Sequence, residues 1–79
     1  MRVKILLFAQ LRELAGKGEV VLDVDPGTRA MDLPGNLFPT GGISVLSKVR
    51  YAVNQDYVPA ETVLKEGDEA ALIPPVAGG

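Results

Sequence analysis

The sequence predicts an α+β fold in which a mixed sheet of about four to five strands is covered on one face by a short helix. A chain of 79 residues, 47% of them hydrophobic, has the size and composition of one small globular domain. Short apolar segments of strand length stand towards both ends of the sequence, and turn residues separate them. Between them lies one segment with a helix start signal. This order of hairpin, helix and further strands is typical of the α+β class.

The first 25 residues predict two antiparallel strands. Residues 3–9 (VKILLFA) form an apolar run that a single lysine interrupts, and its short length favours a strand buried on both faces. Residues 10–16 supply a helical turn or an irregular loop, which glycine ends. Residues 19–25 (EVVLDVD) then alternate from Val20 onward, as expected of a half-buried strand paired with the first.

The central segment carries the weakest pattern. Thr28 is placed to cap a helix. The apolar positions of this helix are Met31, Leu33 and Leu37. Pro34 and Gly35 are expected to end it after about one turn, because proline removes a helical hydrogen bond. A second short helical stretch is expected over residues 44–49.

Two later segments complete the predicted sheet. Residues 49–58 (VRYAVNQDYV) predict a strand that runs to Asn54, a turn, and a short return strand at residues 57–58. The last strand is expected from Glu69 to Ile73, after the turn residues EGD. Two prolines end it, because proline cannot donate a hydrogen bond to a neighbouring strand.

The first and last strands are apolar at successive positions, ILLF at 5–8 and AALI at 70–73. Strands with one solvated face normally alternate, whereas strands covered on both faces need not. Since one short helix covers only one face, we expect the second face to carry an apolar patch that binds a partner. The alternative is that Phe8 and Ile73 are ordinary core or tolerated surface residues.

Composition argues against several classes of function. The chain has no cysteine and no histidine, so a zinc–thiolate site, a nucleophilic thiol and the commonest general base are all missing. We therefore expect no metal site and no catalytic side chains of the chain's own. The net charge of −2 without a basic cluster argues against nucleic-acid binding. No apolar run approaches the roughly 20 residues that cross a bilayer, and the first residues lack a cleavage site, so a cytoplasmic location is expected.

The predicted domain covers residues 1–73, and residues 74–79 (PPVAGG) form a C-terminal tail. The two prolines favour an extended exit, and the six residues would reach roughly 18–20 Å from the sheet. Glycines lack a Cβ atom, so such a tail can enter a narrow channel, although terminal residues are also often merely frayed. The distinctive reactive group at its tip is the carboxylate of Gly79, which needs activation, most simply by ATP. The chain has no phosphate-binding glycine motif, so a partner enzyme would have to bind the ATP.

Three segments resemble the small subunits of molybdopterin synthase: VKILLFAQLRELAG, YAVNQDYV and LKEGDEAALIPPVAGG. The resemblance implies a ubiquitin-like β-grasp fold and a sulfur carrier for molybdenum cofactor biosynthesis. In that family an E1-like adenylating enzyme adenylates the terminal glycine, and a sulfur donor converts it to a thiocarboxylate. The large synthase subunit then uses the sulfur to build the dithiolene of molybdopterin. Residues 32–48 depart from the family, which usually has a longer, charged helix there.

Residue by residue, the resemblance makes Gly79 the sulfur-bearing residue and makes Phe8 and Ile73 candidate contacts with the large subunit. The tail that would enter the partner's active site consists of Pro74, Pro75, Val76, Ala77 and Gly78. The chain would then be a non-catalytic subunit of a sulfurtransferase complex. The alternatives are a sulfur carrier for thiamin synthesis or tRNA thiolation, a ubiquitin-like modifier joined to lysines, and an interaction module whose glycines are incidental.

Overall fold

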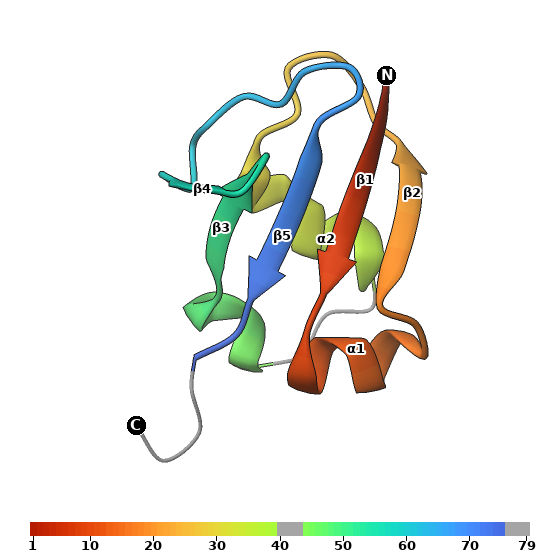
Figure 1. Ribbon diagram of the computed structural model, residues 1–79, viewed down its shortest axis with the longest axis vertical. Helices are drawn as coiled ribbons and strands as arrows, with labels where there is room; N and C mark the ends of the chain where they lie inside the picture. The colour runs from red at the N-terminus through yellow and green to blue at the C-terminus, as the bar shows by residue number, and fades with distance from the viewer. Residues whose placement is uncertain (40–43, 76–79) are drawn as a thin grey trace.

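The computed structural model describes residues 1–39 and 44–75, which form a five-stranded sheet with helical segments packed against it (Figure 1). The strand order is β2-β1-β5-β3-β4. The elements are β1 (Arg2–Leu7), α1 (Ala9–Ala15), β2 (Glu19–Asp23), the 3₁₀ turn η1 (Ala30–Asp32), α2 (Leu33–Leu37), the 3₁₀ segment η2 (Ser44–Lys48), β3 (Arg50–Val53), β4 (Asp56–Val58) and β5 (Glu69–Ile73). The central strands β1 and β5 are parallel and the other pairs are antiparallel. The predicted α+β class with a mixed sheet is confirmed.

The connection between β1 and β2 contains a helix, which was one of the two predicted possibilities. The helix α1 ends at Gly16, whose φ of 77° is a left-handed conformation that glycine adopts without steric cost. The N–H of Gly16 donates to the carbonyl of Arg12 at 2.9 Å. Leu11 is the buried residue of α1, and through it the helix closes one end of the core.

The central segment becomes helical one residue later than predicted. Thr28 is not the cap, because its Oγ1 donates to the carbonyl of Asp25 at 2.7 Å in the preceding turn. The N-cap of η1 is Arg29, whose N–H donates to Oδ2 of Asp32 at 2.8 Å. The prediction that Thr28 caps the helix was therefore wrong.

Pro34 lies at the start of α2 and does not end the helix. A proline in the first turn is tolerated because its missing N–H would have no helical partner there. The predicted break at Pro34 and Gly35 was therefore wrong, and the helix continues to Leu37. Leu33 is fully buried, whereas Met31 is 49% exposed and does not belong to the core.

The last strand β5 lies where it was predicted, and the hairpin of β3 and β4 lies within one residue of its predicted position, since β3 ends at Val53 and β4 begins at Asp56. Two turn residues join β3 to β4, and their φ values are 51° at Asn54 and 75° at Gln55, as a type I′ turn requires. Asn54 also connects this hairpin to β5. Its Nδ2 donates to Oδ1 of Asp68 at 3.0 Å, and its Oδ1 accepts the N–H of Glu69 at 3.1 Å.

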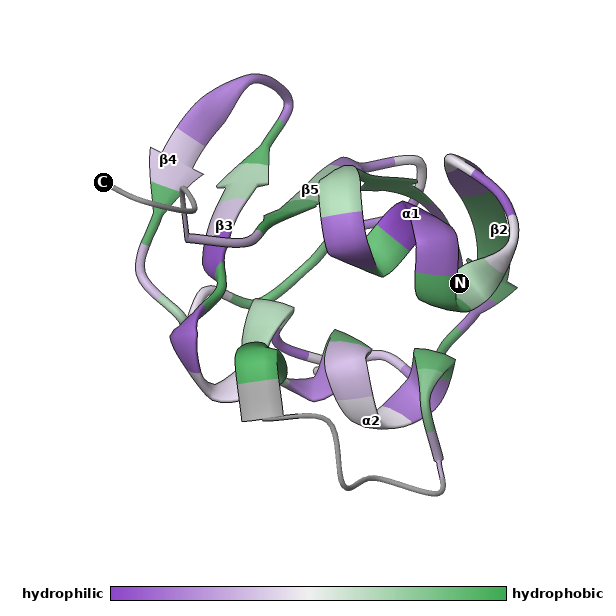
Figure 2. Ribbon diagram, turned by 90° about the horizontal axis from the view of Figure 1, so that it is seen from below, coloured by the Kyte–Doolittle hydropathy of each residue, from purple (hydrophilic) through white to green (hydrophobic). Residues whose placement is uncertain are grey.

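The core lies between the sheet and the helical layer. Figure 2 shows the sheet and α2 as two layers, with α1 at the end of the molecule nearest the viewer. Burial alternates along β1 and β5, so the prediction that the first strand is buried on both faces was wrong. In the described part of the chain the helices leave the second face uncovered, and we name it the open face. The core consists of Val3, Ile5, Leu7, Leu11, Val24, Leu33, Leu64, Ala70 and Leu72.

Candidate functional site

The parallel pairing of β1 and β5 brings the two predicted contact residues together. Leu7 of β1 lies opposite Leu72 of β5, so the next residues, Phe8 and Ile73, stand at the same end of the sheet. Both line a groove of about 250 Å³ on the open face, which we name the apolar groove. Its lining residues are Leu6, Phe8, Ala52, Gln55, Tyr57, Glu69, Ala71 and Ile73.

Tyr57 is the groove residue that sequence reasoning missed. It is 68% exposed and lies opposite Ala52 in the β3–β4 pair. The small Ala52 side chain leaves the Tyr57 ring free to form a wall of the groove. One signal in the sequence could have identified it. Tyr57 is an aromatic residue two positions after the turn residue Gln55, on a strand of three residues.

The backbone next to Phe8 has an unusual conformation. Phe8 itself is extended, with φ −126° and ψ 156°, whereas the following Ala9 has a φ of 48°. Left-handed backbone is uncommon for a residue with a Cβ atom. This sharp turn takes the chain from β1 into α1 and leaves the Phe8 side chain 46% exposed beside the groove.

The other half of the open face, over β2 and the start of β1, carries charged pairs. Arg2 Nε lies 3.7 Å from Asp23 Oδ1, and Lys4 Nζ lies 3.6 Å from Glu19 Oε1 and 3.7 Å from Glu69 Oε2. Such exposed pairs contribute little to stability, but they give the groove a polar rim at Glu69. The predicted apolar patch thus lies over β5, β3, β4 and the end of β1 that carries Leu6 and Phe8.

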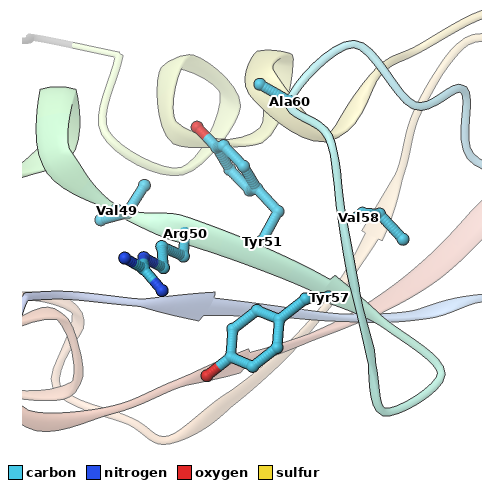
Figure 3. A pocket seen from close by; sticks show the side chains of 6 residues that line it. All are labelled: Val49, Arg50, Tyr51, Tyr57, Val58 and Ala60. Carbon is cyan, nitrogen blue, oxygen red and sulfur yellow. The ribbon is translucent and has the colours of Figure 1, made fainter.

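A second hollow, of about 300 Å³, lies at the edge formed by β3 and β4. It is lined by Val49, Arg50, Tyr51, Tyr57, Val58 and Ala60. Figure 3 shows Tyr51 and Tyr57 extending to opposite sides of the hairpin. Burial, together with the negative charge of Asp32, raises the pKa of the Tyr51 hydroxyl above its ordinary value. Tyr57 lines both the hollow and the apolar groove, so the two sites adjoin.

The strand β5 leads the chain out of the sheet beside the apolar groove. Figure 1 shows the chain continuing from the end of β5 away from the sheet. Ile73 is the last residue of β5, the next residue Pro74 is buried, and Pro75 is exposed. The remaining predicted tail residues, Val76, Ala77, Gly78 and Gly79, lie outside the described residues. The structure therefore places the start of the tail next to the groove, and the roles predicted for these residues stay predictions.

The open face offers apolar contact area next to the point where the chain leaves the fold. Within residues 1–39 and 44–75, no group of three or more acidic side chains gathers in a way that would hold a metal ion. No helix in these two ranges is long and apolar enough to cross a membrane.

Comparison with known proteins gives matches over the whole chain. The ThiS family matches residues 5–79. The chain is 37% identical to the molybdopterin synthase sulfur carrier subunit of Chlamydomonas reinhardtii, and the match covers both chains completely. It is 41% identical to the subunit of that name from Drosophila erecta, covering all of this chain and 92% of that protein. The predicted resemblance to this family is confirmed.

The solved structures with similar folds include three informative ones. SAMP1 from Haloferax volcanii, a small archaeal modifier protein, has a TM-score of 0.81 and 28% identity, with both chains fully covered. A complex of subunits 1 and 2 of molybdopterin-converting factor from Helicobacter pylori contains a chain with a TM-score of 0.66 and 22% identity, again with full coverage of both. A Caldiarchaeum subterraneum ubiquitin has a TM-score of 0.66 and 17% identity, covering 100% of this chain and 98% of that one. The last two show the fold alone, and they confirm the predicted ubiquitin-like β-grasp.

Proposed function

The chain belongs to the ThiS family, and we propose that it is the sulfur carrier subunit of a molybdopterin synthase. The observation that carries this proposal is the position of the apolar groove. The groove lies where β5 leads into the last six residues, which end in Gly78 and Gly79. A partner protein that docks on the groove therefore lies next to the emerging C-terminus.

The chemistry we propose takes place on the carboxylate of Gly79. One carboxylate oxygen attacks the α-phosphorus of ATP on an E1-like adenylating enzyme, which releases pyrophosphate and gives an acyl-adenylate. A sulfur nucleophile at the oxidation level of hydrosulfide then displaces AMP from the carbonyl carbon and leaves a thiocarboxylate. The carrier supplies only this terminal group, and the partner binds the ATP.

The partner we propose for the apolar groove is the large subunit of molybdopterin synthase. The related Helicobacter pylori chain was solved as a complex of subunits 1 and 2 of molybdopterin-converting factor. Exposed aromatic side chains such as Phe8 and Tyr57 are typical anchors of protein interfaces. With Phe8 and Ile73 buried against the large subunit, residues 74–79 would point into its active site.

A second candidate function is protein modification. It is favoured by the likeness to SAMP1, which is named a small archaeal modifier protein. In that case the activated carbonyl of Gly79 would form an isopeptide bond with a lysine amine and would not pass on sulfur.

The test is the intact mass of the full chain after incubation with the adenylating enzyme, ATP and a sulfur source. We expect a mass shift that matches one oxygen replaced by sulfur, and we expect it to disappear after the large subunit and the pterin precursor are added. The control is a variant that lacks Gly79, which should keep the circular dichroism spectrum of the full chain and show no shift. Isopeptide adducts on other proteins without a sulfur shift would favour the modifier. Loss of the sulfur to a thiamin precursor or to tRNA, but not to the pterin precursor, would favour the other carrier classes.

A further inference from the structure

Arg50 lies at the start of β3, on the same face of the sheet as the apolar groove. Its register partner in β5 is Ile73, a groove residue. Side chains two positions apart on a strand share a face, so Arg50 also points to the same side as Ala52. Figure 3 shows Arg50 beside the hollow at the β3–β4 edge, which shares Tyr57 with the groove.

The Arg50 side chain has no ion-pair or hydrogen-bond partner among the described residues. Arg2 and Lys4 of β1 also lie on the open face, and both have partners. Arg2 is paired with Asp23, and Lys4 is paired with two carboxylates. Within residues 1–39 and 44–75, Arg50 is therefore the unmatched cation on the strands of the open face, and it stands at the end of the groove where the chain leaves β5.

The walls of the hollow fit an acidic side chain of another protein. Val49, Val58 and Ala60 offer apolar contacts, which suit the methylene groups of an aspartate or glutamate. The planar guanidinium presents paired N–H donors that match the two oxygens of a carboxylate.

We propose that Arg50 is a specificity contact, and that the partner docked on the apolar groove places an aspartate or glutamate side chain in the hollow at the β3–β4 edge. This inference rests on the proposed function, because the partner is the large synthase subunit of that proposal. The apolar groove supplies contact area, which many proteins could fill. The pair with Arg50 fixes the register of the complex and disfavours partners that leave this cation unpaired in the interface.

The experiment measures the affinity of the full chain for the large subunit by calorimetry at several salt concentrations. Arg50→Gln is expected to weaken binding about tenfold and to flatten the salt dependence, because it removes one charge pair. Arg50→Lys keeps the charge but cannot form the bidentate hydrogen bonds of a guanidinium with a carboxylate. Its loss of affinity is expected to lie between those of the wild type and Arg50→Gln. Arg2→Gln is the matched control: it makes the same chemical change on the same face, outside the groove, and should leave affinity within about twofold. Circular dichroism of each variant checks the fold.

The inference stands if Arg50→Gln weakens binding at least fivefold more than Arg2→Gln and also lowers the salt dependence. It is overturned if either effect is missing. A variant of the groove itself, Phe8→Glu, separates this result from a failure of the proposed function. If Phe8→Glu abolishes binding while Arg50→Gln does not change it, the groove still binds the large subunit and only the role of Arg50 is wrong. If neither variant changes binding, the groove is not the docking surface and both proposals fail.

Discussion

Leu72 and Ile73 are neighbours in β5 and have nearly the same size, yet they lie on opposite faces of the sheet. Leu72 is fully buried in the core, whereas Ile73 lies on the open face and lines the apolar groove. The covered face gains its free energy from burial when the chain folds. Apolar area on the open face gains a comparable free energy only when a partner buries it. Similar side chains therefore contribute to stability on one face and to binding on the other.

The largest effect that separates the two faces is expected from Leu72→Ala. Removing a fully buried leucine side chain leaves a cavity and should lower the free energy of unfolding by about 3 kcal/mol. Ile73→Ala should cost less than half as much, because its side chain is only partly buried. Denaturant unfolding followed by circular dichroism measures both. Equal losses for the two variants would contradict the assignment of the two faces.

The next largest effect is expected from Phe8→Glu. Placing a charge in the apolar groove should raise the dissociation constant for the large subunit by about 100-fold and should change stability by less than about 1 kcal/mol. Val21→Glu is the matched control, since Val21 is 54% exposed but lies on the charged half of the open face. Unchanged affinity of the Phe8→Glu variant in calorimetry would return Phe8 to the class of tolerated surface residues.

A smaller effect is expected at the turn between β3 and β4. Gln55 has a φ of 75°, which glycine adopts with less strain. Gln55→Gly should therefore raise the free energy of unfolding by roughly 0.5–1 kcal/mol. Asn54→Gly is a useful comparison, because it removes the two side-chain hydrogen bonds to Asp68 and Glu69 and should destabilise the fold instead. A loss of stability in Gln55→Gly would show that the glutamine side chain contributes more than the strain costs.

The smallest expected effect is on the pH dependence of stability and comes from Tyr51, which packs towards the core. This effect appears only at alkaline pH. The pKa of its hydroxyl is raised above the ordinary 10.0, first by burial and second by Asp32. The folded state then holds the proton more tightly than the unfolded state, so stability is unaffected below pH 10 and falls as the pH rises through the raised value. We expect the free energy of unfolding to fall more between pH 9 and roughly pH 11 in the wild type than in Tyr51→Phe. Identical pH profiles for the two proteins would contradict the raised pKa.

The strands could be predicted closely because their signals are local. The alternation after Val20, the turn at Asn54 and the two prolines after Ile73 each limit what the backbone can do. The helical start was predicted less well. The hydroxyl of Thr28 could serve either as a helix cap or in the preceding turn, and Pro34 could either end or begin a helix. The local sequence does not distinguish between the two possible roles of Thr28 or between those of Pro34. The tertiary packing of Leu33 decides where the helix lies.

The candidate site divides in the same way. Phe8 and Ile73 were identified from runs of apolar residues that one short helix cannot cover. Tyr57 and Arg50 were not identified from the sequence, because neither lies in such a run of apolar residues. They join the site only through the pairing of β3 with β4 and β5.

By itself, the sequence determined the class of fold and the positions of the strands, because these depend on the periodicity of apolar residues and on proline and glycine. The tertiary structure decided which apolar residues remain exposed and which residues meet. The parallel pairing of β1 with β5 puts Phe8 next to Ile73, and the helical layer covers one face of the sheet in the described part of the chain. A sheet joins residues far apart in sequence through its register, and no local pattern contains that register.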